Sequence, residues 1–168
     1  LEKKHQYCII EMGANHKHEI TLLCAIARPD ISVITNANNA HLGEFGSEQN
    51  LVKAKGEILE SLSKDGLAII NKSSPHIKVW KEMSGTENLT FFGDDSAVFA
   101  SEIEENKSRI NFNLNLNGKS INIDLLMVGL HQVDNALAAA SCALELGIKP
   151  NLIKKGLESA LPEKGRLE

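Results

Sequence analysis

The sequence predicts an α/β domain in which a mostly parallel β-sheet is flanked by helices and carries a small antiparallel portion. Over the first half of the chain, short apolar runs rich in β-branched residues alternate with helical segments, which is typical of parallel βαβ units. From about residue 98 the pattern changes to alternating apolar and polar residues, as in half-exposed antiparallel strands. A length of 168 residues, 42% of them hydrophobic, suits one domain with a real core.

The elements of the first half follow from apolar runs and the residues that end them. A strand is expected over residues 7–11, a helix from Glu19 to Ala27 that Arg28-Pro29 stops, and a buried strand from Ile31. A polar loop then leads to an amphipathic helix with Ser47 as its N-cap, which Lys64-Asp65-Gly66 ends. The remaining expected elements of this half are strands 67–70 and 89–92 and, between them, helix 75–83.

The second half predicts a hairpin and two helices. Strands are expected over residues 98–100, 109–116 and 121–126, with Asn117-Gly118 as the tight turn between the last two. An alanine-rich helix spans residues 132–146 and ends at Gly147, and Pro150 begins a final helix that reaches about residue 160.

Composition and charge exclude several classes of function. The net charge of −4 gives no basic field for nucleic acid, and no apolar run approaches the roughly 20 residues that a membrane span requires. Cys8, Cys24 and Cys142 stand apart in apolar segments without metal-binding spacing. We therefore expect reduced core cysteines in a cytoplasmic protein without membrane insertion.

Two tempting motifs have simpler explanations. Gly118-Lys119-Ser120 matches the end of a phosphate-binding loop, but Asn113 stands where that pattern needs glycine, and the flanks alternate like strands. A hairpin turn explains this segment better. His16, His18 and Glu19 suggest metal ligands, but no third ligand follows at a recognised spacing, so a polar loop and a helix start are favoured.

Three residues lie where open α/β sheets bind ligands, at the carboxyl ends of strands and just beyond. Glu11 ends the first expected strand, where it would meet a cation or phosphate or simply hydrogen-bond the strand end. His41 lies in the loop after the next strand and has the same two interpretations. Lys55 would ordinarily be a solvated helix lysine. None of the three decides between these alternatives alone.

The combination of motifs is more specific. In order, the chain contains Glu-Met-Gly-Ala-Asn-His (11–16), Ala-Arg-Pro-Asp (27–30), Ala-His-Leu (40–42) and Ala-Lys-Gly-Glu-Ile (54–58). It continues with Gly129 and His131, Asn-Ala-Leu-Ala-Ala (135–139) and Gly-Arg-Leu-Glu (165–168). This order closely resembles the central ATP-binding domain of the Mur ligases. Within the family it looks most like the branch that adds D-alanyl-D-alanine to a UDP-N-acetylmuramoyl-tripeptide in peptidoglycan synthesis.

The resemblance implies an ATP-dependent ligase that forms an amide through an acyl phosphate, with the tripeptide and D-alanyl-D-alanine as substrates. Glu11, His41 and Lys55 would bind Mg²⁺ and act in catalysis, Lys55 after carbamylation by carbon dioxide. Another Mur ligase, a folylpolyglutamate synthase-like ligase and a non-catalytic nucleotide-binding module remain as alternatives.

The resemblance also implies the residues that bind ATP. His131, Gln132 and Asn135 would face the adenine and ribose, Arg166 the phosphates, and Asn36 would line the crevice. Gln132 departs from the family, which usually has asparagine there, but its longer amide can still bond to the nucleotide.

The resemblance divides the chain into a central domain over residues 1–161 and an exit linker over residues 162–168 toward a C-terminal domain. The family's glycine-rich phosphate loop would lie before residue 1. We therefore expect this chain alone to fold, to bind ATP weakly and not to catalyse, and the whole ligase to be monomeric.

Overall fold

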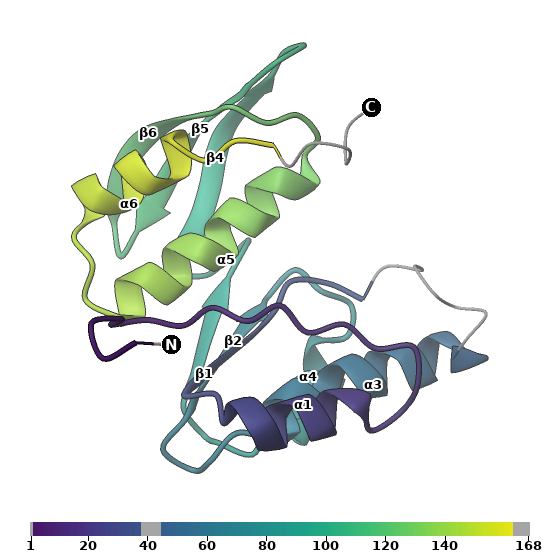
Figure 1. The fold of residues 1–168 in the computed structure, drawn as a ribbon. Helices are drawn as coiled ribbons and strands as arrows, with labels where there is room; N and C mark the ends of the chain where they lie inside the picture. Colours follow the sequence, from purple (N-terminus) through teal and green to yellow (C-terminus); the bar gives the residue numbers. More distant parts are fainter. Residues whose placement is uncertain (1, 38–44, 163–168) are drawn as a thin grey trace.

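The computed structural model describes residues 2–37 and 45–162 of the chain (Figure 1). Its helices are α1 (Glu19–Ala27), α3 (Glu48–Glu60), α4 (Ile77–Met83), α5 (His131–Glu145) and α6 (Pro150–Glu158). Its strands are β1 (Ile31–Ile34), β2 (Leu67–Asn71), β3 (Leu89–Phe92), β4 (Val98–Glu105), β5 (Ile110–Leu116) and β6 (Lys119–Leu125). Within this part of the chain, no helix is long and apolar enough to cross a membrane.

The strands form one sheet in sequence order, from β1 at one edge to β6 at the other. The pairs β1–β2, β2–β3 and β3–β4 are parallel, and β4–β5 and β5–β6 are antiparallel. A single residue pair, Phe92 with Val98, joins β3 to β4. The α/β prediction with an antiparallel portion is confirmed, but the direction changes between β4 and β5, one strand after the alternating pattern begins.

Helices cover both faces of the sheet (Figure 1). On one face, α3 and α4 enclose a core that contains Ile34, Val52, Ile70 and Trp80. Helix α1 packs on α3 at the outside of this layer. On the other face, α5 and α6 cover a larger core that includes Phe92 and the inward side chains of β5 and β6.

Helix α3 forms as its sequence predicts. The Ser47 hydroxyl accepts a hydrogen bond from the Asn50 amide at 3.2 Å, so Ser47 is the expected N-cap. Leu51, Val52 and Leu59 are buried. The indole N–H of Trp80 donates to the Val52 carbonyl oxygen at 3.1 Å, which fixes α4 on α3. The Lys64-Gly66 segment does not end the helix, since α3 stops at Glu60 and a turn follows.

The antiparallel strands show the burial that alternation predicts. Every second residue of β5, from Ile110 to Leu116, is buried, and the residues between are half-exposed. Asn117 and Gly118 both have positive φ, at 48° and 82°, as a two-residue type I′ turn requires. The Gly118-Lys119-Ser120 segment is therefore a hairpin, as predicted.

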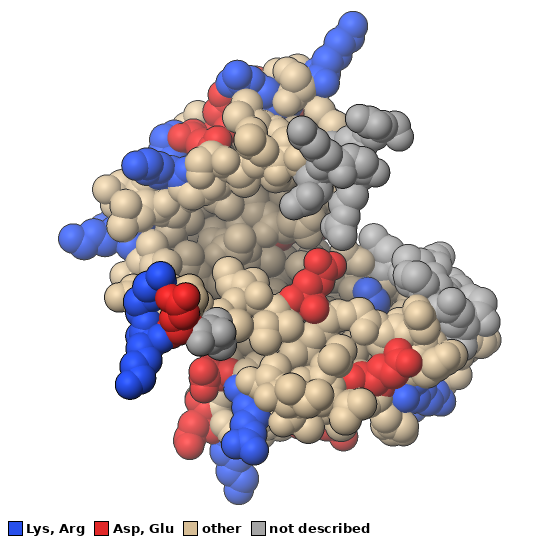
Figure 2. All heavy atoms as spheres, viewed as in Figure 1, with Lys and Arg blue, Asp and Glu red and all other residues tan. Residues whose placement is uncertain are grey.

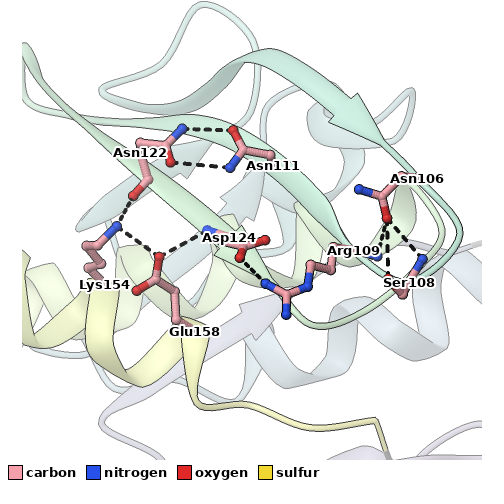
Figure 3. Close-up of polar contacts among 8 residues, drawn as sticks. All are labelled: Asn106, Ser108, Arg109, Asn111, Asn122, Asp124, Lys154 and Glu158. Carbon is pink, nitrogen blue, oxygen red and sulfur yellow. Dashed lines mark hydrogen bonds and ion pairs between the residues drawn. The ribbon is translucent and has the colours of Figure 1, made fainter.

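Side chains of α6 cover the free edge of β6 (Figure 3). The Lys154 ammonium donates to the Asn122 carbonyl oxygen, and the Asp124 amide donates to Glu158 at 3.1 Å. Lys154 and Glu158 also pair with each other at 2.8 Å. Backbone groups that an edge strand would otherwise leave unpaired are thus satisfied within the domain.

The strand expected over residues 7–11 is wrong. These residues form no strand, and Tyr7, Ile9 and Ile10 are exposed. Cys8 is exposed as well, whereas Cys24 is buried and Cys142 half-buried, so Cys8 is not the core cysteine that we expected. A β-rich sequence becomes a strand only with a hydrogen-bonded neighbour, and no described segment pairs with these residues.

Replacing the N-cap of α3 tests how far this helix depends on its first turn. Ser47→Ala should lower the free energy of unfolding by about 1 kcal/mol, because the Asn50 amide loses its acceptor. Ser47→Asp, which keeps an acceptor, is the matched control and should stay near the wild-type value. Urea denaturation measures both, and equal stability of the alanine variant and the wild type would contradict the prediction.

Candidate functional site

A cavity of about 510 Å³ lies where α1, β1 and α3 meet. Residues 11–15 form one wall, and residues 33–36, at the end of β1, form another. Helix α3 contributes Leu51, Ala54, Lys55 and Ile58. Glu11, Asn36 and Lys55, which the sequence singled out from three separate segments, therefore lie around one cavity.

Lys55 is half-buried in this cavity wall. Its ammonium donates to the Asn36 carbonyl oxygen at 3.3 Å, which ties α3 to the segment after β1. Burial lowers the pKa of Lys55 from its ordinary value, because removal of water disfavours the charged form. More of this lysine is therefore a neutral, nucleophilic amine than of a solvated lysine.

The segment that carries Glu11 is held by the start of α1. The Glu19 carboxylate accepts hydrogen bonds from the backbone amides of Asn15 at 2.8 Å and His16 at 3.1 Å. These two bonds, Asn15 first, lower the pKa of Glu19. Glu19 thus has the structural role at a helix start that the sequence favoured. Glu11 itself remains exposed at the cavity.

Residues 2–37 and 45–162 contain no group of three His, Cys, Asp or Glu side chains able to hold a metal ion. His16, His18 and Glu19 are therefore not such a cluster. The predicted cation site needs His41, which lies outside the described residues, and a chemically altered Lys55. An unmodified ammonium would repel a cation, so Glu11 and Lys55 fit Mg²⁺ only if Lys55 becomes an anion.

The predicted adenine-binding residues gather at the first turn of α5. His131 and Asn135 are exposed, and Gln132 is half-buried. The Asn135 amide donates to the Gln132 side-chain oxygen at 3.1 Å. These three do not line the cavity, but the first turns of α5 and α3 lie on the same side of the molecule (right in Figure 1). Arg166 lies outside the described residues.

The turn before α5 requires its glycine. Gly129 has a φ of 95°, and a Cβ there would lie 2.6 Å from Cε1 of His131. Its amide donates to Glu105 at the end of β4. Glycine therefore allows the His131 ring to lie against the backbone of the turn.

Asp134 lies in the same first turn of α5. Burial, and to a smaller extent the nearby Asp94, raise the pKa of its carboxyl.

Sequence reasoning missed Glu57, the buried carboxylate of α3, and Glu105. Glu57 is only 6% exposed, and it accepts hydrogen bonds from the start of α1. Its signal was its position, since it lies near the buried Ala54 in a helix whose neighbouring turns are apolar. Glu105 gave no signal, because it ends a long exposed strand segment.

The surface agrees with a small local site. Figure 2 shows many charged side chains around the outline of the molecule, and acidic and basic side chains also border the hollow between its upper and lower parts. This face carries no broad basic patch of the kind that binds a nucleic-acid backbone.

The fold and cavity place the chain in the class of α/β proteins that bind ligands at strand ends. The family model described as the Mur ligase middle domain matches residues 1–143. The chain belongs to this family.

Relatives named UDP-N-acetylmuramoyl-tripeptide–D-alanyl-D-alanine ligase are similar over nearly the whole chain. The protein from Haemophilus influenzae is 39% identical over 168 residues, which cover 99% of this chain and 36% of the relative. The protein from Escherichia coli K12 is 33% identical over 170 residues, which cover 99% and 38%. The chain thus spans little more than a third of the length of these relatives.

Solved structures show the same relation. A crystal structure of MurF from Acinetobacter baumannii superposes with a TM-score of 0.95 at 38% identity, covering 100% of this chain and 37% of that one. MurF ligase from Thermotoga maritima, solved in complex with ADP, has a TM-score of 0.79 over 91% of this chain and 35% of its own. At 22% identity, the second comparison supports the fold alone.

Removing the Lys55 charge tests whether its burial opposes folding. Lys55→Met should keep or raise the Tm, because a desolvated ammonium is replaced by an apolar chain. Burial puts the pKa of Lys55 in the folded state below its unfolded value of about 10.4. The free-energy penalty of burying the ammonium therefore destabilises the wild type in full at any pH below the folded-state pKa. This penalty disappears as the pH rises toward the pKa of the unfolded state. The gain in Tm of Lys55→Met over the wild type should shrink over the same pH range.

The exposed Lys53 of the same helix provides the control, since Lys53→Met should show no such pH-dependent gain. Thermal denaturation across a pH series measures both variants. A Tm of Lys55→Met below the wild type at every pH would contradict the prediction.

Proposed function

We propose that this chain is the ATP-binding middle domain of a ligase that joins D-alanyl-D-alanine to a UDP-N-acetylmuramoyl-tripeptide in peptidoglycan synthesis. The observation that carries the proposal is the similarity to ligases of that name at 39% identity over 99% of the chain. The cavity that brings Glu11, Asn36 and Lys55 together supports it.

Identity favours this substrate pair over those of other family members. Relatives named for D-alanyl-D-alanine addition are 31–39% identical to this chain. The structure of a ligase named for 2,6-diaminopimelate addition is 20% identical, and a pseudomurein peptide ligase is 24% identical. Both of these support the shared fold but not a shared substrate.

Glu11, His41 and Lys55 are the proposed cation ligands. The neutral amine of Lys55, which burial favours, would attack carbon dioxide, form an N–C bond and release a proton. The resulting carbamate is an anion, and it would face the same cavity as Glu11. A bound Mg²⁺ would offset the negative charge of the phosphoryl group during transfer. Carboxylate, carbamate and imidazole are ligands that suit this role.

The nucleotide would lie between this cavity and the start of α5. His131, Gln132 and Asn135 would contact adenine and ribose, and Asn36 would line the crevice beside the phosphates. Arg166 would approach the phosphates with its planar pair of N–H donors. The hydrogen bond from Asn135 to Gln132 holds both amides near His131 before nucleotide binds.

The reaction would use ATP as a substrate. A carboxylate oxygen of the tripeptide would attack the γ-phosphorus, the bond to the β-phosphate oxygen would break, and ADP would leave. The amine of D-alanyl-D-alanine would then attack the acyl-phosphate carbonyl carbon. Phosphate would depart, and the amine would lose a proton as the amide forms. The chain's own residues would hold the reacting groups in line.

We place the middle domain at residues 1–161 and a linker toward a further domain at residues 162–168. The relatives' greater length supports further domains in the whole ligase. We propose that the enzyme works in the cytoplasm, where its substrate ATP is made, and as a monomer.

Assay of the full-length protein tests the proposal. With ATP, UDP-N-acetylmuramoyl-tripeptide and D-alanyl-D-alanine, mass spectrometry should detect the pentapeptide product and ADP in equal amounts. Glu11→Gln and Lys55→Arg should lower kcat about 100-fold or more, because each removes an anionic ligand of the Mg²⁺ that would offset the negative charge of the transferring phosphoryl group. Lys53→Arg, at an exposed lysine of the same helix, should leave kcat unchanged.

Carbon-13 NMR with labelled bicarbonate provides a second measurement on the same proteins. The wild type should show a carbamate signal that Lys55→Arg lacks. A wild type that forms no product with these substrates would refute the proposed function, whatever the carbamate signal shows.

A further inference from the structure

Glu57 is a buried carboxylate on α3, two residues after Lys55. One of its oxygens accepts from the His18 amide at 2.8 Å. The other accepts from the Thr21 amide at 3.1 Å and from the Thr21 hydroxyl at 3.0 Å. All three donors belong to the beginning of α1, so one side chain of α3 holds the start of another helix.

These bonds replace a missing local cap. The side chain of His18, the N-cap residue of α1, makes no capping hydrogen bond, and its φ of 70° is unusual for a residue other than glycine. Glu57 supplies the acceptor from α3 instead, and its negative charge complements the positive end of the α1 dipole. A carboxylate with little exposed surface is stable only when hydrogen-bonded in this way.

The start of α1 is in turn joined to the segment with Glu11. Glu19, in the first turn of α1, accepts from Asn15 and His16 just before the helix. The Cys24 thiol of α1 contacts the Met12 sulfur at 3.7 Å. Residues 12–16 are thus connected to α1 at two points, through Glu19 and Cys24, and α1 is connected to α3 through Glu57.

We infer that Glu57 is a positioning residue of the proposed cation site, which fixes the segment bearing Glu11 relative to the helix bearing Lys55. It would not touch the cation or the substrates. The inference rests on the proposed function, because it assigns Glu57 a purpose only if Glu11 and Lys55 act together. Supporting groups of this kind typically change metal affinity about 10- to 100-fold when they are removed.

The test compares Glu57→Gln and Glu57→Ala in the full-length ligase. Glutamine keeps one oxygen acceptor but turns an –NH₂ group toward donors, and alanine removes both acceptors. Each should raise the Mg²⁺ concentration at half-maximal rate about tenfold, while kcat at saturating Mg²⁺ stays within about threefold of the wild type. Mn²⁺ binding, followed by electron paramagnetic resonance without substrates, should weaken in parallel.

Two further variants separate positioning from stability. Glu60→Gln, at an exposed carboxylate of the same helix, should leave the Mg²⁺ midpoint and Mn²⁺ affinity unchanged. Thr21→Val removes only the hydroxyl bond and should shift the midpoint about twofold, a change small enough for the protein to remain folded. It keeps the test decisive should Glu57→Ala fail to fold.

Folded Glu57 variants with the Mn²⁺ affinity and Mg²⁺ midpoint of the wild type would overturn the inference. A fall in kcat that saturating Mg²⁺ does not restore, with unchanged Mn²⁺ affinity, would also overturn it, since stability alone would then explain the loss. Absence of ligase product from the wild type would refute the proposed function instead, and the Mn²⁺ comparison would still test Glu57.

Discussion

The burial of charged groups on α3 is the constraint around which this part of the domain is built. Lys55 and Glu57 lie within one turn of the same helix, and the packing of α1 and β1 against α3 removes both from water. Glu57 accepts three hydrogen bonds, whereas Lys55 donates to the Asn36 carbonyl oxygen, the one acceptor it has among residues 2–37 and 45–162, and burial lowers its pKa. The helix thus carries one fully hydrogen-bonded carboxylate and one lysine whose pKa is lowered by burial.

The two side chains therefore suit different roles, although they are only two residues apart in the sequence. A fully hydrogen-bonded carboxylate fixes the geometry of its partners, which is a structural role. A half-buried lysine with few partners is easily changed in its charge state. The same helix therefore holds the wall of the cavity in place and carries the lysine whose carbamylation we propose.

Most of the fold could be predicted from the sequence, because its signals are local. Ser47, the Asn117-Gly118 turn and the alternation in β5 act through neighbouring residues, and all three were confirmed. The strand over residues 7–11 failed because strand formation depends on a partner that periodicity cannot show.

The site was predictable only in part. Glu11, Asn36 and Lys55 were found from strand-end positions and from the resemblance, and the structure places them around one cavity. Glu57 and Glu105 were missed because a glutamate in a helix or strand is ordinarily solvated. Glu57 is hydrogen-bonded by Thr21, 36 residues away in the sequence, and Glu105 by Gly129, 24 residues away. A local sequence pattern cannot predict contacts over such separations.

The covered edge of β6 has a consequence for how copies of this domain can meet. Lys154 and Glu158 occupy the Asn122 carbonyl and the Asp124 amide, two of the backbone groups through which another strand would add, and this opposes extension of the sheet on that side. The opposite edge of the sheet is β1. Growth into a continuous fibre needs pairing at both edges of a sheet, so α6 protects the domain against it by blocking part of one edge.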